Sequence, residues 1–146
     1  MKRRVDPTAS LRVLGMARTL SKSEQAQLSV VYWAALDEFS HGRGDETHFD
    51  SLAGAVNLAL VLAERSANNA DAIALIQSAQ DALMRAQHRS KTLGRFGFDG
   101  PGYAAVQAVL DLHDQQLALC TGKQIIDAMD EAIRRMRVGY VFEISA

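Results

Sequence analysis

The sequence contains one cysteine, almost no net charge and no apolar run long enough to cross a membrane. Cys120 has no second thiol with which to form an intrachain disulfide, which fits a reducing compartment. The 16 basic and 17 acidic side chains leave a net charge of −1, so no overall field attracts the chain to nucleic acid or to an anionic membrane. The most apolar stretch, Leu52 to Ala63, is much shorter than the roughly 20 residues of a transmembrane helix.

The N-terminus also lacks the features of a secretory signal. It opens with the basic cluster Lys2, Arg3 and Arg4, but no apolar segment follows this cluster. Together with the single cysteine, this predicts a cytoplasmic protein.

Motifs of nucleophilic catalysis and of phosphate binding are missing as well. No Gly-x-Ser-x-Gly sequence occurs, and Cys120 lies on the apolar side of its predicted helix, where a thiol behaves as a small hydrophobe. The stretch LGRFGFDGPG, residues 93–102, has four glycines, but their spacing matches neither the P-loop nor the dinucleotide-binding fingerprint. We interpret this stretch as a connector between two helices, and we expect neither an enzyme nor a bound cofactor.

Helical periodicity is the dominant pattern in the rest of the sequence. A chain of 146 residues with 48% hydrophobic content is long enough for one domain with one core. Apolar residues recur at intervals of three and four along most of its length, which is typical of amphipathic helices. The pattern predicts an all-α, single-domain bundle of about five to six helices over residues 1–146, with a flexible start at 1–8 and a short extended tail at 140–146.

Capping residues mark the expected helix boundaries. Short polar side chains satisfy the free amides of a first helical turn, and glycine accepts the left-handed conformation that often ends a helix. The candidates, in chain order, are Asp6-Pro7 for a first short helix, the capping box Ser21 to Glu24, a similar start at Thr47 to Asp50, Asn69 or Asp71, the terminator Gly94, Asp99 before Pro101, and Thr121, unless the helix only bends there.

The segment from Leu52 to Ala63 is apolar nearly all round, with Asn57 as its only polar break. A helix without a polar face has to be surrounded by other helices, so this segment is expected to be the central element. His113 falls between Leu110 and Leu117 on the inner stripe of a later helix. Asn57 and His113 are therefore the expected buried polar residues, and a contact between them would fix the register of the two helices.

Two groups of large apolar side chains fall outside any regular helical stripe. Phe96 and Phe98 lie in the glycine-rich connector, and they form a contact surface if their rings are not tucked into the core. Tyr140, Phe142 and Ile144 lie in the strand-like tail, which has to pack on the helices, pair with a second copy or meet a partner. We expect both groups to contact another protein, or a second copy in a homodimer.

The charges are unevenly distributed, which leaves a nucleic-acid-binding alternative open. Residues 1–22 and 85–95 are basic, whereas residues 37–50 are rich in Asp and Glu. A positive face that combined the two basic segments could bind a phosphate backbone. Its candidate contacts are Arg3, Arg4, Arg89, Lys91 and Arg95.

Histidines near carboxylates leave a metal-binding alternative open too. Glu38 and His41 have the Glu-x-x-His spacing of carboxylate-bridged di-metal bundles, but the chain has no second copy of this spacing. A looser site could combine His41, Asp45 and His48. We assign no metal ligand on this basis.

Three stretches carry a resemblance to other proteins: RTLSKSEQAQL at 18–28, GRFGFDG at 94–100 and VLDLHDQQ at 109–116. They resemble small uncharacterised accessory proteins encoded on plasmids and prophages of proteobacteria. The resemblance implies an accessory role in a mobile genetic element, exerted by binding a host protein or an element protein, and it brings no catalytic residue with it. The sequence therefore favours a non-enzymatic helical binding protein.

Overall fold

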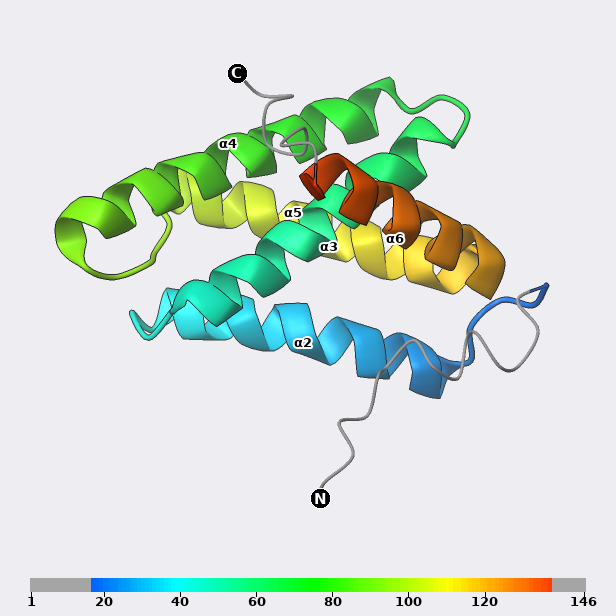
Figure 1. Cartoon of the computed structure of the whole chain (residues 1–146), viewed down its shortest axis with the longest axis horizontal. Coiled ribbons are helices and arrows are strands. Elements are labelled where there is room, and N and C mark those ends of the chain that lie inside the picture. Colours follow the sequence, from blue (N-terminus) through cyan, green and yellow to red (C-terminus); the bar gives the residue numbers. More distant parts are fainter. Residues whose placement is uncertain (1–16, 138–146) are drawn as a thin grey trace.

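In the computed structural model of the chain, residues 17–137 are described, and they form five α-helices without a sheet (Figure 1). The helices are α2 (Lys22–Ser40), α3 (Glu46–Glu64), α4 (Ala70–Leu93), α5 (Gly100–Leu119) and α6 (Gly122–Arg137). The predicted all-α bundle is thus confirmed. The helix expected after Pro7 and the tail at 140–146 lie outside the described residues.

The capping residues explain why most helices begin and end where they do. Ser21 forms the expected capping box with Glu24 at the start of α2, and Asp99 accepts a hydrogen bond from the amide of Gly102 at the start of α5. Gly94 ends α4 with φ 70°, in the left-handed region that glycine adopts without strain. These boundaries follow from local hydrogen bonding that the sequence makes visible.

Two starts differ from the expectation. The N-cap of α3 is Asp45 rather than Thr47, and its carboxylate accepts from the amide of His48 while His48 Nδ1 accepts from the Asp45 amide. Asn69 stands at the N-cap of α4 without a side-chain cap bond. Its Nδ2 donates instead to the Ala63 carbonyl at 3.0 Å, at the end of the preceding helix.

The helical segment is interrupted between α5 and α6, so these are two separate helices and not one bent helix. The Thr121 hydroxyl accepts from the amide of Gln124, and the Gln124 side chain accepts from the amide of Thr121. Thr19 forms an isolated antiparallel bridge with Thr121, so the chain that enters α2 lies beside this junction. The cap prediction at Thr121 is confirmed.

The central position of α3 is also confirmed. This helix packs against α2, α4, α5 and α6 (Figure 1), and most of its side chains from Phe49 to Ala63 are buried. The core around it is aliphatic and draws its largest fully buried apolar side chains from all five helices: Leu36, Leu52, Val56, Val61, Ile76, Leu83, Val106, Leu110, Leu117 and Ile125. Removing this surface from water is the main term that holds the bundle together.

Candidate binding groove

One stripe of the central helix is only partly covered by its neighbours: Gly54 is exposed, Ser51 and Leu58 are half-buried and Ala55 is buried. Ser51, Gly54, Ala55 and Leu58 follow one another at helical spacing on α3 and face a groove between α2 and α6. Both of these helices pack on α3, and they diverge from each other above it (Figure 1). The α2–α6 groove, as we call it, encloses about 300 Å³, at the lower end of the usual range for binding pockets.

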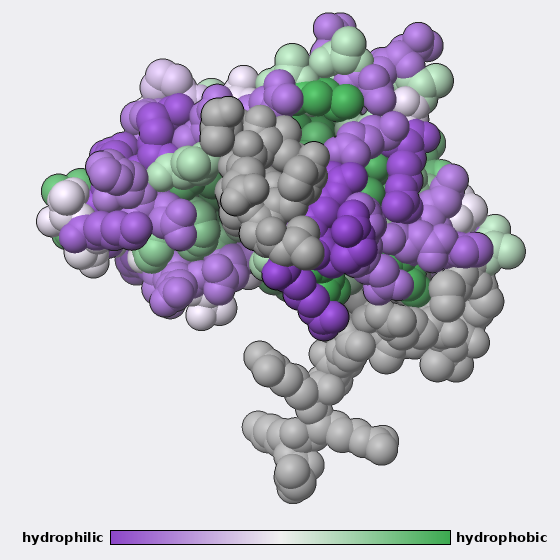
Figure 2. Space-filling model, turned by 45° about the horizontal axis from the view of Figure 1, so that its top comes forward, coloured by the Kyte–Doolittle hydropathy of each residue, from purple (hydrophilic) through white to green (hydrophobic). Residues whose placement is uncertain are grey.

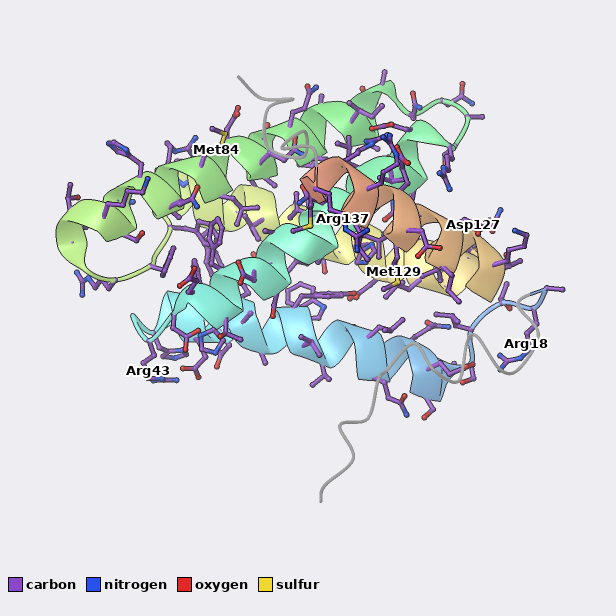
Figure 3. The ribbon with its side chains drawn as sticks, in the orientation of Figure 1. Arg18, Arg43, Met84, Asp127, Met129 and Arg137 are labelled. Carbon is purple, nitrogen blue, oxygen red and sulfur yellow. The ribbon has the colours of Figure 1, made fainter. Side chains whose placement is uncertain are left out.

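The walls of the α2–α6 groove are apolar. Met129 lies on the side of α6 that faces α2 (Figure 3). The other groove-lining residues of these two helices are Leu28, Val31 and Tyr32 from α2 and Ile125, Ala132, Ile133 and Met136 from α6. Among residues 17–137, the one charged side chain in the lining is Asp50, at the beginning of α3.

Large apolar side chains remain exposed along the rim of this groove. Val31 is 50% exposed, Ile133 45% and Met136 55%. Hydrophilic residues cover most of the face in Figure 2, with hydrophobic residues in separate patches between them. Exposed apolar side chains that line one groove, as these three do, mark a contact site more often than apolar residues scattered singly.

The floor of the groove lies close to the α3 backbone at Ser51, Gly54 and Ala55 because these residues are small. A Cβ atom built at Gly54 would have no atom within 4 Å, so the surface above α3 is open at this point. Ser51 and Ala55 flank Gly54 on the same stripe. A partner backbone can therefore approach α3 closely.

Asn57 lines the inner end of the groove and is 2% exposed. Its Oδ1 accepts a long hydrogen bond of 3.5 Å from Gln80 Nε2 on α4. Its Nδ2 is buried and has no hydrogen-bond partner among the described residues. An unsatisfied buried donor costs about 1–3 kcal/mol in the free energy of unfolding.

His113 lines the same inner end from α5 and is also 2% exposed. Gln116 Nε2 donates to the Ala59 carbonyl at 3.1 Å, which turns Gln116 Oε1 toward His113 Nδ1 at 2.8 Å. Because Oε1 only accepts, Nδ1 must carry the proton, and Nε2 of the neutral ring is left with a free lone pair. Nε2 has no hydrogen-bond partner within residues 17–137.

The environment of His113 favours its neutral form. Burial lowers the pKa of this imidazole, and the hydrogen bond to Gln116 and the nearby Asp114 charge only partly oppose the effect. The Tyr32 ring lies beside the imidazole, with centroids 5.4 Å apart. His113 is thus a rigid, uncharged acceptor at neutral pH.

Asp114 fixes the α2 side of this arrangement. Its two carboxylate oxygens accept hydrogen bonds from the Tyr32 hydroxyl and from Trp33 Nε1, the latter at 2.9 Å. Burial, and then the bond to Asp114, raises the pKa of the Tyr32 phenol far above its usual value. The Tyr32 hydroxyl therefore already donates its proton to Asp114 and is not available as a donor to an occupant of the groove.

The two polar residues expected in the core are both buried, but they do not bind each other. Asn57 bonds to Gln80 and His113 to Gln116, so each polar residue is paired with a glutamine that the sequence pattern did not predict to be buried. Gln80 follows Ile76 by four residues and Gln116 follows His113 by three. This helical spacing is the signal that could have identified them.

The aromatic connector is explained by packing within the chain. The Phe98 ring lies 4.9 Å from the Phe39 ring, and the Phe96 ring lies 5.2 Å from the Phe49 ring. Gly44 and Phe96 also form an antiparallel backbone bridge. The contact surface predicted at Phe96 and Phe98 required that their rings not pack into the core. The rings do pack there, where they close one end of the core.

The described basic residues do not form one face. Arg89, Lys91 and Arg95 stand at the end of α4, next to the acidic corner at residues 37–50, since Gly44 pairs with Phe96. Arg18 and Arg43 lie at opposite ends of α2 (Figure 3), and Gly122 donates to the Arg18 carbonyl at the far end of α5. A helix of 20 residues separates these ends by about 30 Å. Arg3 and Arg4 lie outside the described residues.

Within the described part of the chain, no group of three or more His, Cys, Asp or Glu residues is placed to hold a metal ion. Glu38 pairs with Arg43 at 2.9 Å, His41 Nδ1 donates to the Asp37 carbonyl, and His48 serves in the α3 cap. Burial raises the pKa of the Cys120 thiol, which disfavours a reactive thiolate.

Comparison of the chain with protein-family models, with curated proteins and with solved structures gives no match in any of the three. None of the helices between residues 17 and 137 combines the length and apolar character of a membrane span. Tyr140, Phe142 and Ile144 lie outside the described residues. The fold and the groove geometry are therefore the basis for assigning a function.

Proposed function

We propose that this chain is a non-enzymatic binding protein whose α2–α6 groove receives an amphipathic helix of another protein. The observation that carries the proposal is the exposed apolar rim, Val31, Ile133 and Met136, over the partly covered stripe of α3. A helix that is apolar nearly all round is stable in water when every side of it is covered. Four helices pack around α3, and its remaining side forms the floor of the groove.

The shape of the groove supports a helical occupant. Helices pack with their axes about 8–10 Å apart when small residues lie at the contact, and Ser51, Gly54 and Ala55 supply such a contact on the floor. Val31 and Ile133 stand on the two walls, where they would contact the flanks of an inserted helix. Recognition of this type uses apolar anchors at i, i+3, i+4 and i+7 of the partner.

The resemblance to accessory proteins of plasmids and prophages supports a partner from the host or from the mobile element itself. An accessory role requires a binding surface and no catalytic residues. The α2–α6 groove is such a surface. The partner helix in this proposal comes from a second protein, and self-association through the groove is the alternative that the experiment below separates from it.

The test compares the wild-type chain with Gly54→Leu and with Leu119→Gln. Leucine at position 54 fills the floor of the groove without meeting another atom at its Cβ, whereas Leu119 is 78% exposed at the end of α5 and does not line the groove. We expect a protein from a host lysate to bind the wild type and Leu119→Gln but not Gly54→Leu. A synthetic helix from that protein should show the same pattern.

Equal capture by all three chains, or by none of them, would contradict the proposal. Light scattering of the three purified chains addresses the alternative occupant. If the wild type and Leu119→Gln are dimers and Gly54→Leu is a monomer, the occupant of the groove is a second copy of this chain and not a helix of another protein.

A further inference from the structure

The described chain enters the bundle at one end of the α2–α6 groove. Gly122, the first residue of α6, donates its amide to the Arg18 carbonyl at 3.0 Å, and Thr19 bridges to Thr121. The segment that precedes α2 is therefore tied to the start of α6, and both walls of the groove begin on this side of the bundle (Figure 1). Residues 1–16, outside the described part of the chain, lead into this junction.

The length of this leading segment fits the length of the groove. The α6 wall of the groove runs from Ile125 to Met136, which is about 16 Å at the rise of an α-helix. The sequence after Asp6-Pro7 predicts a short helix that ends at Gly15, and residues 7–15 would form about 13 Å of helix. Such a helix would span most of the groove.

The leading segment also has an apolar side to cover. Leu11 and Leu14 lie three residues apart on one side of the predicted helix, and Ala9 and Val13 lie on the other side. A helix of this length is marginal in water by itself, so it needs a surface that covers the two leucines. The exposed apolar rim of the groove is such a surface next to the junction.

Charge favours this segment over the one that follows α6. Residues 1–16 carry four basic side chains and one acidic side chain, whereas the only charged side chain of residues 138–146 is Glu143. The charge in the described lining is Asp50, and because α3 begins where α2 ends, this carboxylate lies at the end of the groove opposite to the junction. A segment that runs along the groove from the junction brings its basic residues toward Asp50, which is electrostatically complementary.

We infer that residues 7–14 form a helix that lies in the α2–α6 groove and competes with the proposed partner helix. Leu11 and Leu14 contact the exposed rim, and the floor at Gly54 stays open below them. The partner helix then binds only when this segment leaves the groove, so the chain regulates its own binding surface. The competition rests on the proposed function, whereas the position of the segment can be tested without a partner.

The methionines of the chain can report this position. Met129 and Met136 line the groove, whereas Met84 lies on α4 and does not line it (Figure 3). A nitroxide attached at Ser10→Cys, in a full chain that also carries Cys120→Ser, broadens the NMR signals of nearby methyl groups. We expect the Met129 and Met136 methyl signals to lose most of their intensity and the Met84 signal to keep most of its own.

Paired variants of the labelled chain show whether the two leucines hold the segment in the groove. Leu11→Gln/Leu14→Gln should restore both groove signals. The matched control Ala9→Gln/Val13→Gln changes the other side of the predicted helix and should leave them broadened. Gly54→Leu fills the floor of the groove and should restore them as well.

A synthetic peptide of residues 1–16 measures the competition. If the segment of the chain covers the groove for about nine-tenths of the time, the apparent dissociation constant of an added occupant rises about tenfold. The peptide should therefore bind unlabelled Leu11→Gln/Leu14→Gln about tenfold more tightly than it binds the wild type or the control. It should also displace a protein that the wild type captures from a host lysate.

The outcomes separate this inference from the proposed function. Equal broadening of all three methionine signals, or of none, would overturn the inference, and capture of a host protein by the wild type would then still support the proposed function. Broadening of the groove signals from a nitroxide at Ser145→Cys but not from Ser10→Cys would assign the groove to residues 138–146 and overturn the inference too. Broadening as expected, with no host protein captured by any chain, would confirm the position of the segment and overturn the proposed function.

Discussion

The end of the bundle near Gly44 and the α2–α6 groove are both built from apolar side chains of α2 and α3, but they are covered differently. At the Gly44 end, the connector between α4 and α5 folds back and places Phe96 and Phe98 against Phe39. Over the groove, no segment of the described chain lies on Gly54 in the same way. The same kind of residue therefore serves stability at one place and is available for binding at the other.

The difference shows that apolar content alone does not identify a binding surface. Phe96 and Phe98 look like contact residues in the sequence because they stand in a glycine-rich loop, but their rings complete the core. Leu58 and Met129 look like core residues because they follow helical spacing, but they line an open groove. Substitutions at the two places should therefore have different effects on folding.

The largest effect is expected from Phe39→Ala at the closed end. Phe39 is buried, and its ring contacts both connector aromatics. Truncation removes these contacts and leaves a cavity, which costs about 3–5 kcal/mol in the free energy of unfolding. Urea denaturation followed by circular dichroism measures the change, and a loss below about 1 kcal/mol would show that the connector does not close the core.

The next largest effect is expected from Gly44→Ala, which should lower the free energy of unfolding by about 1–3 kcal/mol. A Cβ at this position would lie 2.5 Å from Phe39 Cδ1, and the Phe39 ring cannot move away because the connector aromatics hold it. Denaturation of the double variant Gly44→Ala/Phe39→Leu supplies the control. If the clash is the cause, the alanine should cost less in this background than in the wild type.

Much of this fold could be predicted from the sequence because its signals are local. The capping box at Ser21, the glycine at position 94 and the apolar run from Leu52 each specify their own segment. The groove could not be predicted, because it depends on how far α2 and α6 diverge over Gly54, and that distance is set by packing between distant segments. For the same reason Asn57 and His113 could be recognised as buried polar residues, but their partners Gln80 and Gln116 could not be assigned.

Gly54→Ala should have the opposite sign from Gly44→Ala, although the substitution is the same. Gly54 is exposed in the interior of α3, and an added Cβ meets no atom within 4 Å. Alanine at this position restricts the unfolded chain and favours the helix, so we expect the free energy of unfolding to increase by about 0.5–1 kcal/mol. Thermal unfolding of the two alanine variants beside the wild type gives a direct comparison, and destabilisation by Gly54→Ala would mean that the floor of the groove is already covered.

The smallest effect is a pH dependence that belongs to the groove and not to the closed end, where the packed rings carry no ionisable group. Because burial lowers the pKa of His113 below the ordinary value of 6.5, the unfolded chain takes up a proton at this residue that the folded chain does not. The free energy of unfolding should therefore decrease as the pH falls below about 6.5, and this decrease should end at the folded pKa. The lowered pKa values of about 2 for Glu24 and Glu131 affect stability only below about pH 4.5 and do not interfere.

Urea denaturation from about pH 8 to about pH 5 measures this dependence. The free energy of unfolding should change less steeply with pH for His113→Phe than for the wild type and for Gly44→Ala. Identical slopes in all three chains would place the imidazole in contact with water and remove it from the inner end of the groove.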